Sequence, residues 1–254
     1  MDFFDSHAHY NDEKFENNKD ELIKEMFNNE ITNITCVGYN LDGSKKAIEI
    51  AQKYPHIFAT CGISPNDLSD NVDKELIKIE EMSLNKKVVA IGEIGLDYYW
   101  NKENKEEQKR VFIKQIEIAN KLNLPIVIHT REAVMDTLQI LKEHPVNKKG
   151  IFHCCPLNQE LIKEGLKLGF YISFSGNITF KNAKSPACIE LVPMDRILIE
   201  TDSPYLSPEP HRGEVNTSLN VKYVAKKIAE VKNIPLEEVA FKTRENAKKI
   251  FQID

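Results

Sequence analysis

Two histidines separated by one residue stand near the start of the chain, at the end of the apolar run Phe3-Phe4-Asp5-Ser6-His7-Ala8-His9. Successive side chains of a β-strand point to opposite faces, so Asp5, His7 and His9 are expected to share one face. Neutral imidazole is a common ligand of divalent metals, and an aspartate beside it could orient or charge the site. Exposed polar residues near a terminus are the alternative, because short motifs often occur by chance.

Four more residues of metal-binding type each end an apolar run further along the chain: Glu93, His129, His153 and Asp202. Together with the first pair they exceed what one tetrahedral catalytic zinc needs, since that site uses three protein ligands and a water. Their number suits two ions about 3.5–4 Å apart. Glu93 is the natural bridge, because each of its two oxygens can bind one ion. A single histidine in an apolar strand is more often packed than ligating, so the prediction depends on all six falling at strand ends.

The apolar runs alternate with amphipathic helical patterns. Strands are expected at residues 3–9, 34–38, 57–63, 88–93, 126–129, 151–153, 171–174 and 196–202. Helices are expected at 13–29, 44–54, 73–85, 106–123, 133–143, 159–168, 218–231 and 236–251, with a short one within 179–191. This alternation predicts an α/β fold, a (β/α)8 TIM barrel made by residues 1–254 as a single domain. An open doubly wound sheet is the alternative, but no glycine-rich phosphate fingerprint follows the first strand.

Barrel topology would gather the candidate ligands. The carboxyl ends of all barrel strands meet at one rim, where active sites are built. The six residues are far apart in sequence but would converge there. The sequence therefore predicts one metal site at the C-terminal end of the strands.

Composition excludes several classes of protein. With 41% hydrophobic and 29% charged residues, the chain is typical of soluble globular proteins. No apolar run approaches the roughly 20 residues of a membrane helix, and no signal-peptide pattern is present, so we expect a cytoplasmic protein without a membrane partner. The five cysteines are odd in number and lack Cys-x-x-Cys spacing, which indicates reduced thiols. A net charge of −5 argues against a general DNA-coating protein, so any contact with nucleic acid should be local.

Several longer stretches surround the candidate ligands. They are Asp5-Ser6-His7-Ala8-His9, Gly92-Glu93-Ile94-Gly95-Leu96-Asp97-Tyr98, Pro125-Ile126-Val127-Ile128-His129-Thr130-Arg131, Phe152-His153-Cys154, Glu200-Thr201-Asp202-Ser203-Pro204-Tyr205-Leu206 and Glu245-Asn246-Ala247. With them, essentially the whole chain resembles the TatD-type metal-dependent hydrolases, a deoxyribonuclease family in the amidohydrolase superfamily. The resemblance implies a TIM barrel that acts as a phosphodiesterase on DNA. It also implies that His7, His9, Glu93 and Asp202 hold one ion, and that Glu93, His129 and His153 hold the second.

Three stretches depart from the family pattern. The usual His-Pro pair after the third strand is Ser64-Pro65, so DNA could be bound differently. The Arg-x-x-Asn-x-Pro loop is only partly kept, as Arg212-Gly213-Glu214-Val215-Asn216-Thr217. Cys154-Cys155-Pro156 replaces an aromatic-containing turn, and Cys154 is expected to be a buried neighbour, although a soft thiolate would favour zinc.

The mechanism that we expect is phosphodiester hydrolysis by metal-activated water at a two-metal site, in an exodeoxyribonuclease. Asp202 would orient or deprotonate the water, or serve only as a ligand, and Glu93 would bridge the ions. Arg131 and Arg212 could clamp a phosphate, or else form surface ion pairs. Tyr98, with Tyr99 and Trp100, could stack on nucleobases, or else anchor the loop by packing.

Two other functions stay open. An amidohydrolase-type enzyme could hydrolyse a small amide, ester or nucleobase; such enzymes often use a carboxylated lysine, and Glu93 takes that place here. A non-catalytic metal-binding scaffold is disfavoured by the intact set of ligands. The two ions could be Zn²⁺, Mn²⁺, Fe²⁺ or Co²⁺, whereas Mg²⁺ usually prefers oxygen ligands. We expect a monomer.

Overall fold

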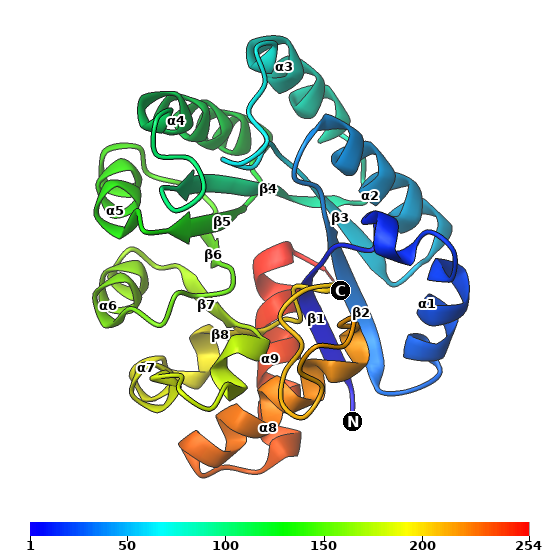
Figure 1. The fold of residues 1–254 in the computed structure, drawn as a ribbon. Helices are drawn as coiled ribbons and strands as arrows, with labels where there is room; N and C mark the ends of the chain where they lie inside the picture. Colours follow the sequence, from blue (N-terminus) through cyan, green and yellow to red (C-terminus); the bar gives the residue numbers. More distant parts are fainter. Residues whose placement is uncertain (254) are drawn as a thin grey trace.

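Runs rich in β-branched and aromatic residues form strands, and the segments between them form helices (Figure 1). The computed structural model describes residues 1–253. The strands are β1 (Phe3–Ala8), β2 (Ile31–Val37), β3 (Ile57–Cys61), β4 (Val88–Asp97), β5 (Ile126–Arg131), β6 (Gly150–Phe152), β7 (Tyr171–Phe174) and β8 (Ile197–Ile199). The helices are α1 (Lys19–Phe27), α2 (Leu41–Lys53), α3 (Val72–Met82), α4 (Lys105–Leu122), α5 (Val134–Glu143), α6 (Gln159–Lys167), α7 (Ser185–Leu191), α8 (Val221–Lys232) and α9 (Leu236–Phe251). Short 3-10 turns are η1 (Glu13–Phe15), η2 (Gly176–Thr179), η3 (Met194–Arg196) and η4 (Ser218–Asn220).

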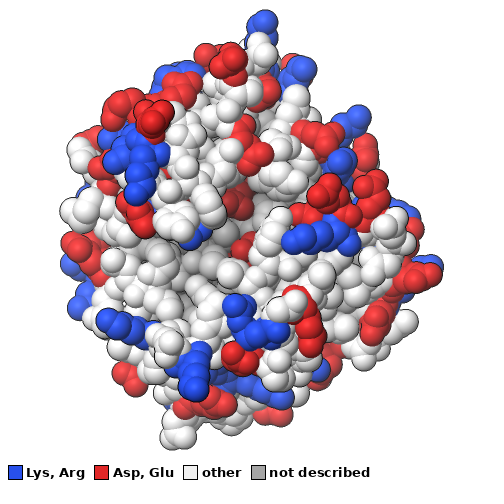
Figure 2. All heavy atoms as spheres, in the orientation of Figure 1, with Lys and Arg blue, Asp and Glu red and all other residues white. Residues whose placement is uncertain are grey.

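The strands form one parallel sheet in chain order, from β1 to β8. A parallel bridge between Ala8 and Ser203 joins the two ends of the sheet, and the His9 N–H donates to the Ser203 carbonyl at 2.7 Å. The sheet is therefore a nearly closed (β/α)8 TIM barrel, which confirms the predicted fold. In the same orientation, Figure 2 shows a hollow near the centre of this face, with acidic atoms inside it and charges of both signs around it.

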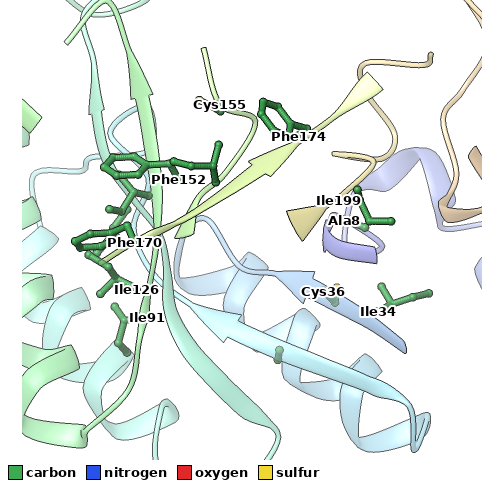
Figure 3. Packing of buried hydrophobic residues seen from close by; sticks show 14 of the residues in the cluster. Ala8, Ile34, Cys36, Ile91, Ile126, Phe152, Cys155, Phe170, Phe174 and Ile199 are labelled. Carbon is green, nitrogen blue, oxygen red and sulfur yellow. The ribbon is translucent and has the colours of Figure 1, made fainter. Parts of the chain in front are cut away.

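Two layers of apolar side chains hold the barrel. The larger layer lies between the sheet and the helices, where the Phe152 and Phe170 ring centroids are 5.3 Å apart (Figure 3). The second layer takes one or two residues from the first positions of six strands, together with the last turns of α9: Phe4, Val89, Ala90, Val127, Ile151, Tyr171, Leu198, Ala247, Ile250 and Phe251. Because these residues stand at the amino ends of the strands, α9 plugs that end of the barrel. Polar side chains occupy the opposite end of the barrel, where the strands have their carboxyl ends.

The helices expose charged faces and bury apolar ones. In α4, Val111, Phe112 and Ile116 are buried, whereas Lys114 and Glu117 pair on the outer surface at 3.1 Å. None of the helices formed by residues 1–253 has the length and apolar character needed to cross a membrane.

Some predicted boundaries were wrong. The helix expected at 13–29 is instead η1 followed by α1: Asp12 caps the short turn by accepting from the Lys14 N–H, and α1 begins after Asn18, a residue type that disfavours helix interiors. The next helix begins earlier than expected, capped by Asn40, whose side chain accepts from the Gly43 N–H at 2.8 Å. β4 continues to Asp97, so Glu93 lies within the strand rather than at its end. β8 stops at Ile199, which leaves Asp202 in the following loop.

Candidate metal centre

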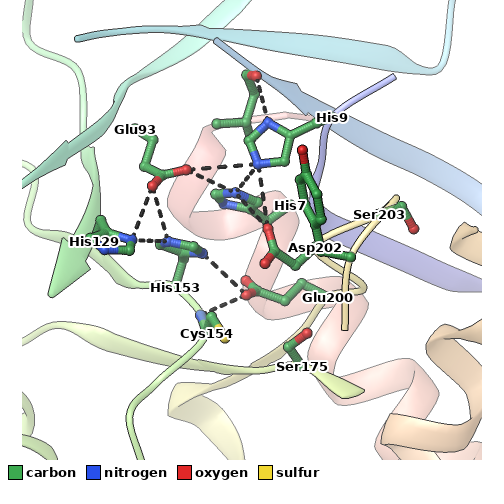
Figure 4. Close-up of polar contacts among 12 residues, drawn as sticks. His7, His9, Glu93, His129, His153, Cys154, Ser175, Glu200, Asp202 and Ser203 are labelled. Atoms are coloured by element: carbon green, nitrogen blue, oxygen red, sulfur yellow. Dashed lines mark hydrogen bonds and ion pairs between the residues drawn. The ribbon is translucent and has the colours of Figure 1, made fainter. Parts of the chain in front are cut away.

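The first group of candidate ligands gathers where β1 ends and the chain leaves β8. The Nε2 atoms of His7 and His9 are 3.1 Å apart. Asp202 Oδ1 lies 3.5 Å from His7 Nε2 and 3.4 Å from His9 Nε2. Glu93 Oε2 lies 3.4 Å and 3.7 Å from the same two nitrogens. Four side chains from three separate parts of the chain therefore point at one spot (Figure 4).

The second group shares Glu93 with the first. Its other oxygen, Oε1, lies 3.1 Å from His129 Nδ1 and 3.5 Å from His153 Nε2. The two imidazoles approach each other at 3.3 Å between these nitrogens. Each oxygen of Glu93 thus faces a different set of histidines, which is the arrangement that a bridging carboxylate requires.

The spacing of the donor atoms fits metal ions. Bonds of about 2.0–2.1 Å to a tetrahedral ion separate its ligand atoms by roughly 3.3 Å. The separations of 3.1–3.7 Å in the two groups are centred on that value. Within residues 1–253, ligand atoms of His7, His9 and Glu93 lie within 4.8 Å of one another, as do those of Glu93, His129 and His153. The residues present therefore suit two cations with a shared carboxylate.

The charges of the cluster are strongly coupled. Burial by itself would raise the pKa of Glu93, but His153, His129 and His7 hold it well below its ordinary value. Burial would lower the pKa of His153, but Glu93 and Glu200 raise it well above the ordinary value. Burial would also raise the pKa of Asp202, which the surrounding histidines lower instead. The cluster thus keeps its carboxylates ionised, as metal ligands must be.

Two of the histidines have an acceptor on the side away from the cluster. His9 Nδ1 lies 3.1 Å from the Val37 carbonyl oxygen, and His129 Nε2 lies 2.9 Å from Asp97 Oδ2. A carbonyl or carboxylate oxygen can only accept, so these ring nitrogens carry the hydrogen. The other nitrogen of each ring, which faces the cluster, keeps its lone pair for a metal.

Asp97 was missed as a functional residue. It is fully buried, and Asn66 donates to the same oxygen as His129, at 3.1 Å. Its other oxygen accepts the backbone N–H groups of Tyr99 and Trp100 at 2.9 and 3.0 Å. Asp97 therefore ties the second group of ligands to the exposed aromatic segment that follows β4. The sequence signal for Asp97 was its place in the stretch Gly92-Glu93-Ile94-Gly95-Leu96-Asp97-Tyr98, which carries part of the family resemblance.

Asp5 does not take the position expected for it. The β1–β2 register is irregular between Asp5 and Ala8, and Asp5 forms no ion pair with a candidate histidine within residues 1–253. Its carboxylate accepts from the Thr201 N–H at 2.9 Å and from the hydroxyls of Thr201 and Ser218 at 2.5 and 2.6 Å. Burial raises the pKa of Asp5 to about 7, despite these hydrogen bonds. Asp5 therefore links β1 to the segments after β8.

The aromatic residues after β4 divide into a buried and an exposed part. Tyr98 is only 7% exposed, and its hydroxyl donates to Asp136 on α5 at 2.7 Å, an arrangement that matches the packing alternative and not the stacking one. Tyr99 and Trp100 are exposed by 44% and 69%. The Arg131 guanidinium carbon lies 3.8 Å from the Tyr99 ring centroid and 5.5 Å from that of Trp100.

The remaining residues singled out in the sequence lie around the rim. Arg212 is exposed, with its guanidinium 3.8 Å from the Phe180 ring centroid and hydrogen-bonded to the Ser207 carbonyl. Ser64, in the place of the family histidine, is 4% exposed and donates its N–H to the Tyr39 carbonyl. Cys154 is half-buried, and burial together with nearby carboxylates raises the pKa of its thiol well above the ordinary value. Among the described residues, the groups of ligand atoms that lie close enough to hold an ion do not include Cys154.

The barrel and the cluster at its carboxyl rim define the class as a metal-dependent hydrolase of TIM-barrel type. The family described as TatD related DNase matches residues 4–252, and the chain belongs to this family. It is 44% identical to the metal-dependent hydrolase YabD of Bacillus subtilis, over 99% of both chains. It is 37% identical to the metal-dependent hydrolase YcfH of Escherichia coli K12, over 100% of this chain and 97% of the relative. The crystal structure of YjjV, a TatD homologue of E. coli, superposes with a TM-score of 0.93 at 23% identity, over 99% and 98% of the two chains.

Proposed function

We propose that this hydrolase cleaves phosphodiester bonds of DNA, and that it does so from a strand end, as an exodeoxyribonuclease. The observation that supports this most is Glu93, with one oxygen toward each of two sets of histidines. Two adjacent cations are a common arrangement in enzymes that cleave phosphodiesters. The name of the family, TatD related DNase, supports DNA as the substrate.

In this proposal, His7, His9, Glu93 and Asp202 hold one ion, and Glu93, His129 and His153 hold the second. When bound, two divalent ions would polarise a phosphoryl oxygen, lower the pKa of water and neutralise charge on the leaving oxygen. The histidine-rich ligand set suits Zn²⁺, Mn²⁺, Fe²⁺ or Co²⁺ better than Mg²⁺.

Asp202 is our candidate for the general base. Its Oδ1 faces His7 and His9, and its Oδ2 has no hydrogen bond to any residue in 1–253. The free oxygen could accept a proton from the attacking water. Both oxygens of Glu93 face histidines, so its proposed part in catalysis is to bind both ions and hold them at a fixed separation.

We place substrate contacts at Arg131, Tyr99 and Trp100, and no longer at Tyr98. Arg131 stands two residues after His129 on β5, so both side chains leave the same side of the strand. Its guanidinium forms no ion pair within residues 1–253, which leaves it free to bind a phosphate. The exposed rings beside it offer a stacking surface for a base. Arg212, in the loop after β8, is a second candidate phosphate contact.

Removing the metals should abolish activity. We expect wild-type protein treated with a chelator and desalted to lose cleavage of end-labelled single-stranded DNA, and to regain it with one or more of the divalent ions added singly. A ligand at 100 times its Kd stabilises a protein by about 2.7 kcal/mol, so the melting temperature should rise on reloading. H129A, which removes a ligand of the second ion alone, should lose cleavage and show a smaller rise in melting temperature on reloading, whereas H144A, changed at the end of α5, should keep both responses in full.

The same assay separates the alternatives. Turnover of a small amide, ester or nucleobase with no cleavage of DNA or of a simple phosphodiester would refute the proposal in favour of an amidohydrolase. Loaded protein that cleaves none of these substrates would favour a scaffold. Cleavage that starts within the strand would correct the exonuclease part alone.

Loss of the exposed aromatic rings should weaken substrate binding. Stacking on a base contributes about 1–3 kcal/mol, so W100A or Y99A should raise KM for single-stranded DNA about 5- to 100-fold, with a smaller effect on kcat. Y98F should leave KM unchanged, since the Tyr98 ring is buried. An oligonucleotide with abasic terminal positions should bind wild type and W100A equally; a preserved difference would contradict a stacking role.

We also propose that the protein acts in the cytoplasm as a monomer. The five cysteines are all free, which suits a reducing compartment.

A further inference from the structure

The histidines of the cluster are not supported equally. Each ring has one nitrogen toward the cluster and one, the outer nitrogen, away from it. The outer nitrogen of His9, Nδ1, is hydrogen-bonded to the Val37 carbonyl, and that of His129, Nε2, to the Asp97 carboxylate. The outer nitrogens of His7 and His153, both Nδ1, are buried and have no hydrogen-bond partner within residues 1–253. Buried polar groups are rarely left without a partner, so an acceptor for these two nitrogens should be close by.

Glu200 is the group in the right position. It is fully buried beyond the end of β8, and its Oε2 also lacks a partner among the described residues. Its Oε1 accepts the Cys154 N–H at 2.6 Å and lies 3.4 Å from His153 Nδ1. Ligand atoms of Glu200, His7 and His153 lie within 4.8 Å of one another. A buried carboxylate with one unpaired oxygen, the unpaired Nδ1 of His153 and a ring nitrogen of His7 thus share one corner.

The stacking of the rings explains how one carboxylate can serve both. The His7 and His153 rings are 4.0 Å apart and 8° from parallel. Their Nε2 atoms lie 3.4 Å and 3.5 Å from the two oxygens of Glu93. Figure 4 shows the ring pair between Glu93 on one side and Glu200 on the other. The two glutamates therefore flank the pair. Glu93 lies along the Nε2 edges, and Glu200 lies beside Nδ1 of His153 and within 4.8 Å of a ring nitrogen of His7.

We propose that Glu200 is a shared positioning residue, which accepts Nδ1–H from His7 and from His153. It thereby fixes both rings in the tautomer that keeps Nε2 unprotonated toward Glu93. The proposal rests on the metal ligands proposed above. Because His7 belongs to one ion and His153 to the other, Glu200 supports both ions at once. Asp97, which contacts only His129 among the cluster histidines, supports one.

The competing occupant of this corner is a third cation held by His7, His153 and Glu200. Each ring would then need both nitrogens unprotonated, one for each side, so each neutral imidazole would have to lose its one N–H proton and become an imidazolate. Two Nδ1–H groups that face a carboxylate need no such loss and leave no buried charge unpaired. The hydrogen-bonded arrangement is therefore favoured, and a third ion becomes an outcome of the test.

The first measurement needs no variant and no metal. Long-range ¹H–¹⁵N spectra of the imidazoles, recorded on the chelated protein at a pH where the rings are neutral, report which nitrogen carries the hydrogen. We expect His7 and His153 protonated at Nδ1, like His9, and His129 protonated at Nε2. Nε2-protonated rings at His7 and His153 would overturn the proposal, even if the protein binds metals as expected. Conversely, wild type that binds no divalent ion would end the proposed metal site and leave this result standing.

The second measurement counts and titrates ions in E200A, E200Q and D97N. Loss of such a support weakens a metal site about 10- to 100-fold, so E200A should weaken both ions by that factor. E200Q should lose less, since its amide oxygen still accepts one N–H. D97N should weaken only the ion bound by His129. Equal affinities in E200A and wild type, loss confined to one ion in E200A, or three ions per wild-type chain would refute the shared role. A fall in melting temperature alone would indicate a purely structural glutamate.

Discussion

Replacing Glu93 with alanine is expected to abolish turnover while the barrel remains folded. The carboxylate places one oxygen 3.4 Å from His7 Nε2 and the other 3.1 Å from His129 Nδ1, so its loss removes a ligand from both proposed ions. Metal ions contribute several kcal/mol of transition-state stabilisation, which corresponds to a fall in kcat/KM of about 10³-fold or more. Metal analysis should show fewer than two ions per chain.

Three results together test this expectation. E93Q keeps the volume of the side chain and one acceptor oxygen. It should bind the ion of the first group more tightly than the ion of the second group, or bind neither. It should not bind two ions at wild-type affinity. E164Q, on the outer face of α6, is the matched control and should behave as wild type. Far-ultraviolet circular dichroism should be unchanged in all three. Full activity of E93A would remove the bridging role and the two-metal proposal with it.

The positions of the candidate ligands could be predicted because the barrel rule acts on local signals. A short apolar run that ends in histidine, as at His129 and His153, indicates both a strand and its carboxyl end. The barrel topology then brings these ends together at one rim. The same rule worked for Asp202 although the strand ends three residues before it, since the loop still lies on that rim. Prediction of the fold thus needed only the alternation of elements and the order of the strands.

The supporting residues could not be predicted in the same way. The roles of Glu200 and Asp97 depend on which nitrogen of which ring faces outward, and that is fixed by contacts between different strands. The burial of Tyr98 could not be predicted for a similar reason, because it depends on α5 and on the hydrogen bond to Asp136. Asp5 followed the period of a regular strand in the prediction, whereas the β1–β2 register is irregular there. In each case a tertiary contact decides what the side chain does.

Asp97 connects the candidate metal site to the exposed aromatic segment that follows β4. One of its oxygens lies 2.9 Å from His129 Nε2, and the other accepts the N–H groups at the start of the exposed aromatic segment. If substrate displaced this segment, Asp97 would move with it and would shift the proposed metal ligand His129. Two residues before Asp97 on β4, Gly95 pairs with His129 on β5.

Replacing Gly95 with alanine is therefore expected to damage both the fold and the site. Gly95 pairs with His129 and has φ +138°, a backbone conformation that side-chain-bearing residues rarely adopt. A Cβ there would lie 2.0 Å from the His129 carbonyl oxygen, so β4 and β5 would have to separate. Both partners are backbone, and nothing flexible can yield. We expect a loss of about 4 kcal/mol or more in the free energy of unfolding, in the class of severe core substitutions.

For a chain of this length that loss corresponds to a fall of about 8–16 °C in melting temperature. G213A is the matched control, since Gly213 also has positive φ, +88°, but has no atom within 4 Å of the added Cβ. It should lose only the backbone cost of about 1–2 kcal/mol. If G95A still folds, the ion bound by His129 should be weakened more than the ion bound by His9, because the strand carrying His129 has been displaced. Equal melting temperatures of G95A and G213A would show that β4 and β5 can part without cost, and that the tight pairing at His129 does not position the metal ligand.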